Sequence, residues 1–256
     1  MKQGPRRIPW GLCAVFCGPA MGAGSPALVY PSGPAVPENL LRIELRFARP
    51  LQAPLTMDQV HLLGQDGHPI EGAFLDLPLP NADSSTVTLL LHPGRLKSGV
   101  GANLQLGRAL QAGASVTLIV DAPRGGKPLR KTWQVVEADV AAPVPASWKL
   151  NAIPGGSALP LVVQLDAAIS STAAALIAVR GPDGKRVEGR ATLADAETSW
   201  RFVPRRPWKA GRYTLMTHPD LEDPAGNRAC SPFEVKRASQ AACEHGTLTP
   251  FTVVAR

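Results

Sequence analysis

The 256-residue chain is poor in aromatic residues and has no long apolar run. Aromatic side chains make up 5% of the sequence, whereas 26 prolines and 24 glycines indicate many turns. A hydrophobic content of 45% is too high for a disordered chain, so the sequence predicts a globular protein. No segment of helical length has the amphipathic spacing of a crossover helix, which excludes a parallel sheet of α/β type.

The sequence also lacks the patterns of metal sites and catalytic nucleophiles. Its five histidines have neither the i, i+4 spacing nor the short Cys/His spacing of a zinc site. GGSALP around Ser157 has Leu159 where a nucleophile elbow requires glycine. Turn residues such as Asp66, Asp183 and Asp223 are explained by side-chain bonds to the backbone that follows them. We therefore expect no catalytic residues, no metal and no cofactor, and a protein that is not an enzyme.

The N-terminus has the composition of a signal peptide over residues 1–24. A basic start, MKQGPRR, precedes a short apolar segment at 8–16 and small residues at 20–23. The apolar segment is too short for a membrane span of about 20 residues. Cys17 raises the alternative of a lipid anchor, but Phe16 stands before it where a small residue is expected. The segment predicts export to the periplasm or cell surface, without a transmembrane segment in the mature chain.

Removal of that segment changes both the charge and the cysteine content. The formal charge of +7 includes three basic residues within 1–24, so the processed chain keeps 24 basic against 20 acidic residues, which is too mild to imply nucleic acid. Cys230 and Cys243 then remain, and in an exported chain they are most simply a disulfide that contributes about 3 kcal/mol. The alternative is two unpaired buried thiols.

One pattern occurs twice and divides the chain into two copies of a β unit. VHLLGQDGHPIEG at 60–72 reappears as IAVRGPDGKRVEG at 177–189, and each copy carries the Asp-Gly pair that signals a β-hairpin. Residues 141–147, AAPVPAS, have the composition of a linker. The expected domains are therefore 25–143 and 144–256.

Short alternating segments predict the strands of each copy. In the first copy LRIELRF at 41–47 alternates apolar with charged residues, and further strands are expected at 87–91, 116–120 and 132–136. In the second copy PLVVQLD, ETSWRFVP and GRYTLMT match the first three, and Phe233 and Val235 match Trp133 and Val135. A last strand is expected at 251–254. Trp133 and Trp200 fall on apolar phases and are expected in the cores.

The second copy resembles a bacterial immunoglobulin-like domain of the surface-layer protein (SbsA-type) family. The resemblance is carried by GPDGKRVEG, by WRFVPRRPWKAGRYTL and by the turn LEDPAGN at 221–227, and the first copy is similar but lacks the Gly-Asn turn. It implies an all-β protein of two tandem immunoglobulin-like antiparallel β-sandwiches. Such domains serve as spacers, adhesion modules and accessory domains, so the resemblance implies no single activity.

Two functions and two surfaces follow as hypotheses. The first function is a structural or adhesion module that binds a protein or a cell-envelope polymer, and the alternative is an accessory domain protein assisting an envelope or polysaccharide-processing enzyme system. An insertion at 95–113 of the first copy either contacts a partner or folds back as a cover over the sandwich. The candidate contact residues are Arg95, Lys97, Leu104, Leu106, Arg108 and Leu110 in the insertion, and Arg205, Arg206 and Trp208 in the second copy.

Overall fold

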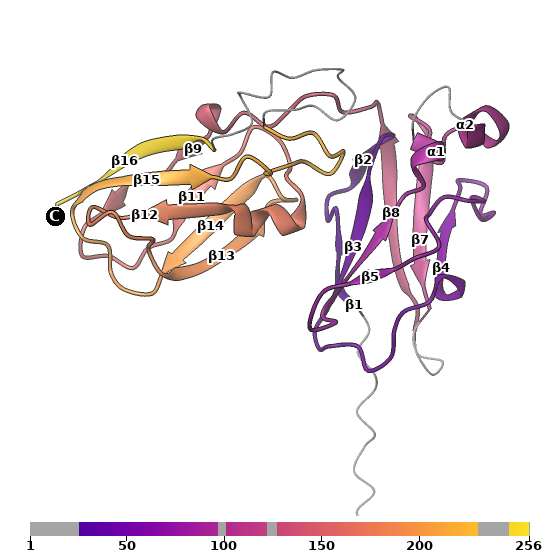
Figure 1. Ribbon diagram of the computed structural model, residues 1–256, viewed down its shortest axis with the longest axis horizontal. Coiled ribbons are helices and arrows are strands. Elements are labelled where there is room, and N and C mark those ends of the chain that lie inside the picture. Colours follow the sequence, from indigo (N-terminus) through magenta and orange to yellow (C-terminus); the bar gives the residue numbers. More distant parts are fainter. Residues whose placement is uncertain (1–25, 97–100, 122–126, 230–245, 256) are drawn as a thin grey trace, which may run out of the picture.

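The chain forms two β-sandwiches in a computed structural model that describes residues 26–96, 101–121, 127–229 and 246–255 (Figure 1). Each sandwich contains two four-stranded sheets. In the first sandwich one sheet has the order β1 (Pro26–Tyr30), β3 (Arg42–Phe47), β6 (Thr86–Leu90) and β5 (Leu79–Pro80). The other has the order β2 (Ala35–Pro37), β8 (Leu129–Val136), β7 (Ser115–Val120) and β4 (Val60–Leu63).

The second sandwich repeats this arrangement strand for strand. One sheet has the order β9 (Lys149–Leu150), β11 (Leu161–Gln164), β14 (Ser199–Pro204) and β13 (Gly189–Ala194). The other has the order β10 (Ile153–Pro154), β16 (Leu248–Val254), β15 (Gly211–Thr217) and β12 (Ile177–Arg180). Short helices complete the chain: η1 (Met57–Gln59), α1 (Pro93–Leu96), α2 (Gly101–Leu106), η3 (Pro145–Ser147) and η4 (Ser171–Leu176).

The strand order is that of an immunoglobulin-like sandwich. In chain order the eight strands of each half take the places A, A′, B, C, D, E, F and G, with A, B, E and D in one sheet and A′, G, F and C in the other. The pairing is antiparallel except that β2 runs parallel to β8 and β10 runs parallel to β16. The predicted all-β class and tandem sandwiches are therefore confirmed.

The repeated Asp-Gly pattern forms the same tight turn in both halves. Gly64 N donates to His68 O at 2.9 Å, and Gly181 N donates to Lys185 O at 2.8 Å. Gly67 and Gly184 have φ values of 80° and 77°, which glycine adopts without steric cost. After each turn the chain pairs with the preceding strand through a single β-bridge, Leu63 with Pro69 and Arg180 with Arg186. The second strand of each predicted hairpin is therefore no longer than this bridge.

One predicted strand correspondence is wrong. In the first sandwich β7 pairs with β8, and in the second the corresponding pair is β15 with β16. Val253 of β16 is therefore in the core, where Phe233 and Val235 were expected to lie. PFEV and FTVV carry the same apolar alternation, so periodicity alone does not choose between them. Residues 233–235 lie outside the described part of the chain.

Each sandwich has its own hydrophobic core. The first is built around Trp133 and the second around Trp200, and both rings are at most 1% exposed, as predicted. At the start of β15 Tyr213 Oη donates to Lys209 O at 2.9 Å, which is the tyrosine corner of immunoglobulin-like domains. The first sandwich has Val116 at the matching position, so only the second has this corner.

The two sandwiches meet at an angle and not end to end. Figure 1 shows the strands of the first sandwich running across the direction of those in the second, with 137–147 passing between them. The contacts come from β3 and the segment before β2 in the first sandwich, and from η4, the β13–β14 turn and residues 221–228 in the second. The predicted boundary at 143/144 stays a prediction.

Candidate functional site at the domain junction

The junction buries a carboxylate on the outer face of the first sandwich. Glu44 points away from the first core, on the same face of β3 as Arg42 and Arg46, yet it is only 2% exposed. Helix η4 of the second sandwich covers it, and Ser171 Oγ donates to Glu44 Oε2. The other carboxylate oxygen of Glu44 has no hydrogen-bond partner among the described residues. The junction is therefore a polar contact that excludes water from a charged group.

The electrostatics of Glu44 are those of a group held in a dry interface. Burial raises the pKa of the Glu44 carboxyl above its usual range, and the positive charges of Arg42 and Arg46 oppose that shift. A buried carboxylate is costly unless it is paired, and here the pairing is incomplete. Glu44 therefore makes the junction sensitive to its charge state.

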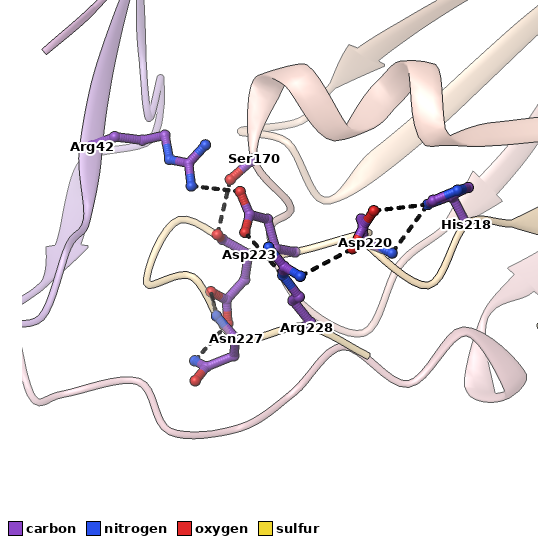
Figure 2. Close-up of polar contacts among 8 residues, drawn as sticks. Arg42, Ser170, His218, Asp220, Asp223, Asn227 and Arg228 are labelled. Carbon is purple, nitrogen blue, oxygen red and sulfur yellow. Dashed lines mark hydrogen bonds and ion pairs between the residues drawn. The ribbon is translucent and has the colours of Figure 1, made fainter. Parts of the chain in front are cut away.

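An ion-pair chain crosses the junction beside Glu44. Arg42 extends from β3 to Glu222, with Nη2 and Oε1 2.6 Å apart and both side chains mostly buried. Figure 2 shows Arg42 reaching toward the turn that carries Asp223 and Asn227. Behind Glu222, Arg228 pairs with Asp220 at 3.0 Å. Close to this pair, Leu41 N donates to Pro224 O at 3.0 Å, so backbone and side chains both join the sandwiches.

A second contact joins the segment before β2 to a strained turn. Ser32 donates to the Glu197 carboxylate from its backbone N at 2.9 Å and from its Oγ at 2.5 Å. Asp195, Ala196 and Glu197 have φ values of 53°, 55° and 64°, a run of left-handed residues without glycine. Such conformations cost free energy and persist where surrounding contacts hold them. Here Glu197 is 3% exposed, so the strain lies at the interface.

The linker is held by one asparagine from each sandwich. Asn39 Nδ2 and Asn227 Nδ2 both donate to Asp139 O, at 2.7 and 2.9 Å. Asn39 Oδ1 also accepts from Asp139 N at 2.9 Å. The Asp139 carbonyl is thus bound by both halves. This Asn39–Asp139–Asn227 arrangement, which we call the linker clasp, fixes the chain where the two sandwiches join.

Asp223 positions the asparagine of the linker clasp. Its carboxylate accepts from Asn227 N at 2.9 Å and from Asn227 Nδ2 at 2.8 Å, and the side chain is 1% exposed. Burial raises the pKa of Asp223 to about 6, although the hydrogen bonds from Asn227 lower it. The turn DPAGN, expected only as turn chemistry, therefore also serves the junction.

Sequence reasoning missed the junction. The alternation in 41–47 identified the inward face of β3 correctly, since Ile43, Leu45 and Phe47 are buried. The same alternation assigned Glu44 to water, because the pattern of one strand carries no information on a second domain lying over its outer face. The only available signal was the Gly-Asn turn, which one copy has and the other lacks.

The insertion folds back over the first sandwich. Arg95 is 5% exposed and donates through Nε to Gly107 O at 2.7 Å and through Nη1 to Glu71 O. Leu110 is 1% exposed, and Arg108 pairs with Glu38 at 2.6 Å. Arg95 and Leu110 are therefore internal and are not available to a partner.

The remaining candidates in the insertion differ in placement. Leu104 and Leu106 on α2 are 74% and 50% exposed, so they alone among the insertion's leucines stay accessible. Lys97 lies outside the described residues. A partner contact at α2 stays a prediction.

The three candidates in the second sandwich separate in the same way. Trp208 is 2% exposed and its Nε1 donates to Leu159 O at 2.8 Å, so its ring belongs to the core and offers no surface to a partner. Arg205 and Arg206 are exposed, and Arg205 pairs with Glu188 at 3.0 Å. These two arginines line a groove at the end of the second sandwich.

Three further expectations concern the cysteines, a metal site and a membrane-spanning segment. Cys230 and Cys243 lie outside the described residues, so their disulfide stays a prediction. Across residues 26–96, 101–121, 127–229 and 246–255, His, Cys, Asp and Glu form no group of three or more that could hold a metal ion. In the same ranges no helix has the length and apolar character needed to span a membrane.

Comparisons with known proteins add solved structures of low similarity. A scan of protein-family models and a search of curated proteins find no match. A chimeric titin Z1Z2 with a decorin peptide is 11% identical over 92% of this chain and 97% of that chain, with a TM-score of 0.31. The Ig1-2 module of the Drosophila receptor protein tyrosine phosphatase DLAR is 12% identical over 88% and 94%, with a TM-score of 0.25. The fold assignment therefore rests on the strand order of this chain and not on these neighbours.

Proposed function

We propose that this chain is a non-catalytic exported protein that acts as a structural or binding and adhesion module at the cell envelope. The observation that carries the proposal is the junction, which joins two immunoglobulin-like sandwiches through Glu44, the Arg42–Glu222 pair and the linker clasp. A fixed tandem of this kind presents the loops at its outer ends in one relative orientation. That property suits an element that spaces or displays binding surfaces.

The buried acids support a structural role over a catalytic one. Strongly perturbed carboxyl groups mark functional sites when they face a cleft that a substrate can enter. Here Glu44 and Asp223 face Ser171 and Asn227, which are structural hydrogen-bond partners across or beside the junction. Burial raises the pKa of both carboxyl groups.

The proposed location at the cell envelope requires export, which cell fractionation tests. The full chain is expressed in its source cells, and the envelope and cytosolic fractions are compared by intact mass. The expected result is a processed chain in the periplasm or at the surface, shortened near residue 24. A full-length chain confined to the cytosol would contradict export and with it the envelope role.

The alternative proposal is an accessory role, as the resemblance to surface-layer domains also allows. The identity of the partner distinguishes it from the structural or adhesion role. Crosslinking of the exported chain in intact cells, followed by mass spectrometry, identifies what it contacts. An envelope-processing enzyme as the dominant crosslinked partner would support the accessory role. A polymer or a non-enzymatic surface protein would support the structural or adhesion role.

A further inference from the structure

The end of the second sandwich away from the first carries a charged groove. It lies between the β12–β13 turn at 181–188 and the segment 205–210 after β14, with a volume of about 450 Å³. Strand β12 begins beside η4 at the junction and runs away from it, so this groove is at the free end of the molecule (Figure 1). We call it the basic groove, and Tyr213 and Trp208 lie beneath it.

Positive charge dominates the basic groove. Its charged lining consists of Lys185, Arg186, Arg205, Arg206 and Lys209 against Asp183 and Glu188, a surplus of three positive charges. The processed chain as a whole is expected to carry a surplus of only four. Most of the net charge of the mature protein is therefore gathered at one end.

Four of these cations have no ion pair within the described part of the chain. Arg205 pairs with Glu188, and Asp183 Oδ1 accepts from Lys185 N in the turn. No described carboxylate lies within ion-pair distance of the exposed groups of Lys185, Arg186, Arg206 and Lys209. Like charges gathered in a concave surface raise the local concentration of anions.

The first sandwich shows why the second has this groove. At the matching place the insertion covers the surface: Leu106 Cδ1 is 4.0 Å from where a β-carbon on Gly72 would lie. Arg95 turns inward there and donates to Glu71 O. The second copy passes from Lys209 through Ala210 alone to Gly211 at the start of β15, so no insertion in the described chain covers the groove.

The backbone of the groove disfavours a peptide bound as an added strand. Gly181 N, Val187 N, Arg205 N and Lys209 N already donate within the sandwich, to Lys185 O, Val179 O, Glu188 O and Tyr213 Oη. Strand addition needs free main-chain donors and acceptors. Recognition therefore falls to the cationic side chains and to the exposed rings of Pro182 and Pro207, which offer apolar faces to a sugar ring.

We propose that the basic groove binds an anionic polysaccharide, whose repeated carboxylate groups contact Lys185, Arg186, Arg206 and Lys209 while its sugar rings lie against Pro182 and Pro207. This inference deepens the proposed function and rests on it for the envelope as the source of the polymer. It names the class of ligand that the binding module takes.

The test measures binding of the full chain to polygalacturonate, a linear carboxylate polysaccharide, with dextran as the uncharged control and poly-L-glutamate as the peptide control. The groove variant is Arg206→Glu with Lys209→Glu. The matched control is Arg49→Glu with Lys149→Glu, which changes the net charge equally at exposed sites outside the groove. Thermal unfolding checks that all variants are folded. If the groove variant is not, Arg206→Gln with Lys209→Gln replaces it, and Arg49→Gln with Lys149→Gln replaces the control.

Polygalacturonate is expected to bind the parent chain, and the groove variant to bind at least about tenfold more weakly, a change of about 1.4 kcal/mol. The control variant should bind within about twofold of the parent, and binding should weaken as salt rises through about 0.1 M, where the screening length is about 10 Å. No binding, equal loss in both variants, or equal affinity for poly-L-glutamate or dextran would overturn the assignment.

The two proposals fail separately. A chain that reaches the envelope in the fractionation experiment but does not bind polygalacturonate would retain the proposed function and lose the polysaccharide site. A chain that binds polygalacturonate through the groove but stays in the cytosol would retain the site and lose the envelope role.

Discussion

Asp223 is a buried carboxyl whose charge burial disfavours. It is 1% exposed, and its carboxylate accepts hydrogen bonds from Asn227 N and Asn227 Nδ2. Its pKa of about 6 exceeds the value near 3.9 of an unfolded aspartate, so the folded state holds the proton more tightly. The contribution of Asp223 to stability is therefore largest below about pH 4, falls as the pH rises, and reaches its low value above about pH 6.

Asp223→Asn should reveal this dependence. Relative to the variant, the parent chain should lose stability between about pH 4 and about pH 6, by at most about 3 kcal/mol. The measurement is the difference in free energy of unfolding between the two chains at several pH values. The control is Asp183→Asn, which changes an exposed carboxylate in the β12–β13 turn. A parent-minus-variant difference that does not change with pH would contradict the account.

Ser171 donates a hydrogen bond to the buried Glu44 carboxylate across the junction, which predicts the effect of removing that donor. Ser171→Ala leaves a buried carboxylate with less compensation and should cost about 1–3 kcal/mol. In a Glu44→Gln background the same change should cost less, because the group left behind is neutral. Chemical unfolding of the four chains of this double-mutant cycle measures the difference. Equal costs in both backgrounds would show that Ser171 does not serve the charge.

At the scale of elements, the insertion of the first sandwich acts as a cover. Replacing 100–113 with a short glycine-serine turn removes Leu110 from the core and two carbonyl acceptors from Arg95. Loss of one buried leucine alone costs about 2–5 kcal/mol, so the melting temperature should fall clearly. Leu104→Ser, at the more exposed leucine of α2, should leave it nearly unchanged. A deletion variant as stable as the parent would contradict the covering role.

Local sequence patterns predict some elements of this fold and not others. Strand β3, the Asp-Gly turns and the buried Trp133 and Trp200 follow local rules of alternation and turn chemistry, and all were predicted. The choice of β16 over 233–235 depends on which of two similar segments pairs with β15, and local patterns do not decide it. The buried Glu44 and the basic groove depend on what lies across from a surface in space. Such relations leave only weak traces in one sequence.

At the scale of the whole molecule, the separate cores predict independent folding. Residues 148–256 contain the whole of the second core, including Trp148 and Trp200. The fragment, made under oxidising conditions, should unfold in one cooperative thermal transition measured by calorimetry. It should be less stable than in the full chain, because the cut exposes the face that packs on β3. A fragment without a cooperative transition would refute the two-domain division.

The contacts at the junction are expected to hold the two sandwiches in one orientation. Residual dipolar couplings of backbone amides in the weakly aligned full chain measure this, since each sandwich reports its own alignment. A single alignment tensor should fit both sandwiches in the arrangement of Figure 1, and Asn227→Ala with Ser171→Ala should separate the two tensors. Two tensors of different magnitude or orientation in the parent chain would contradict a fixed junction.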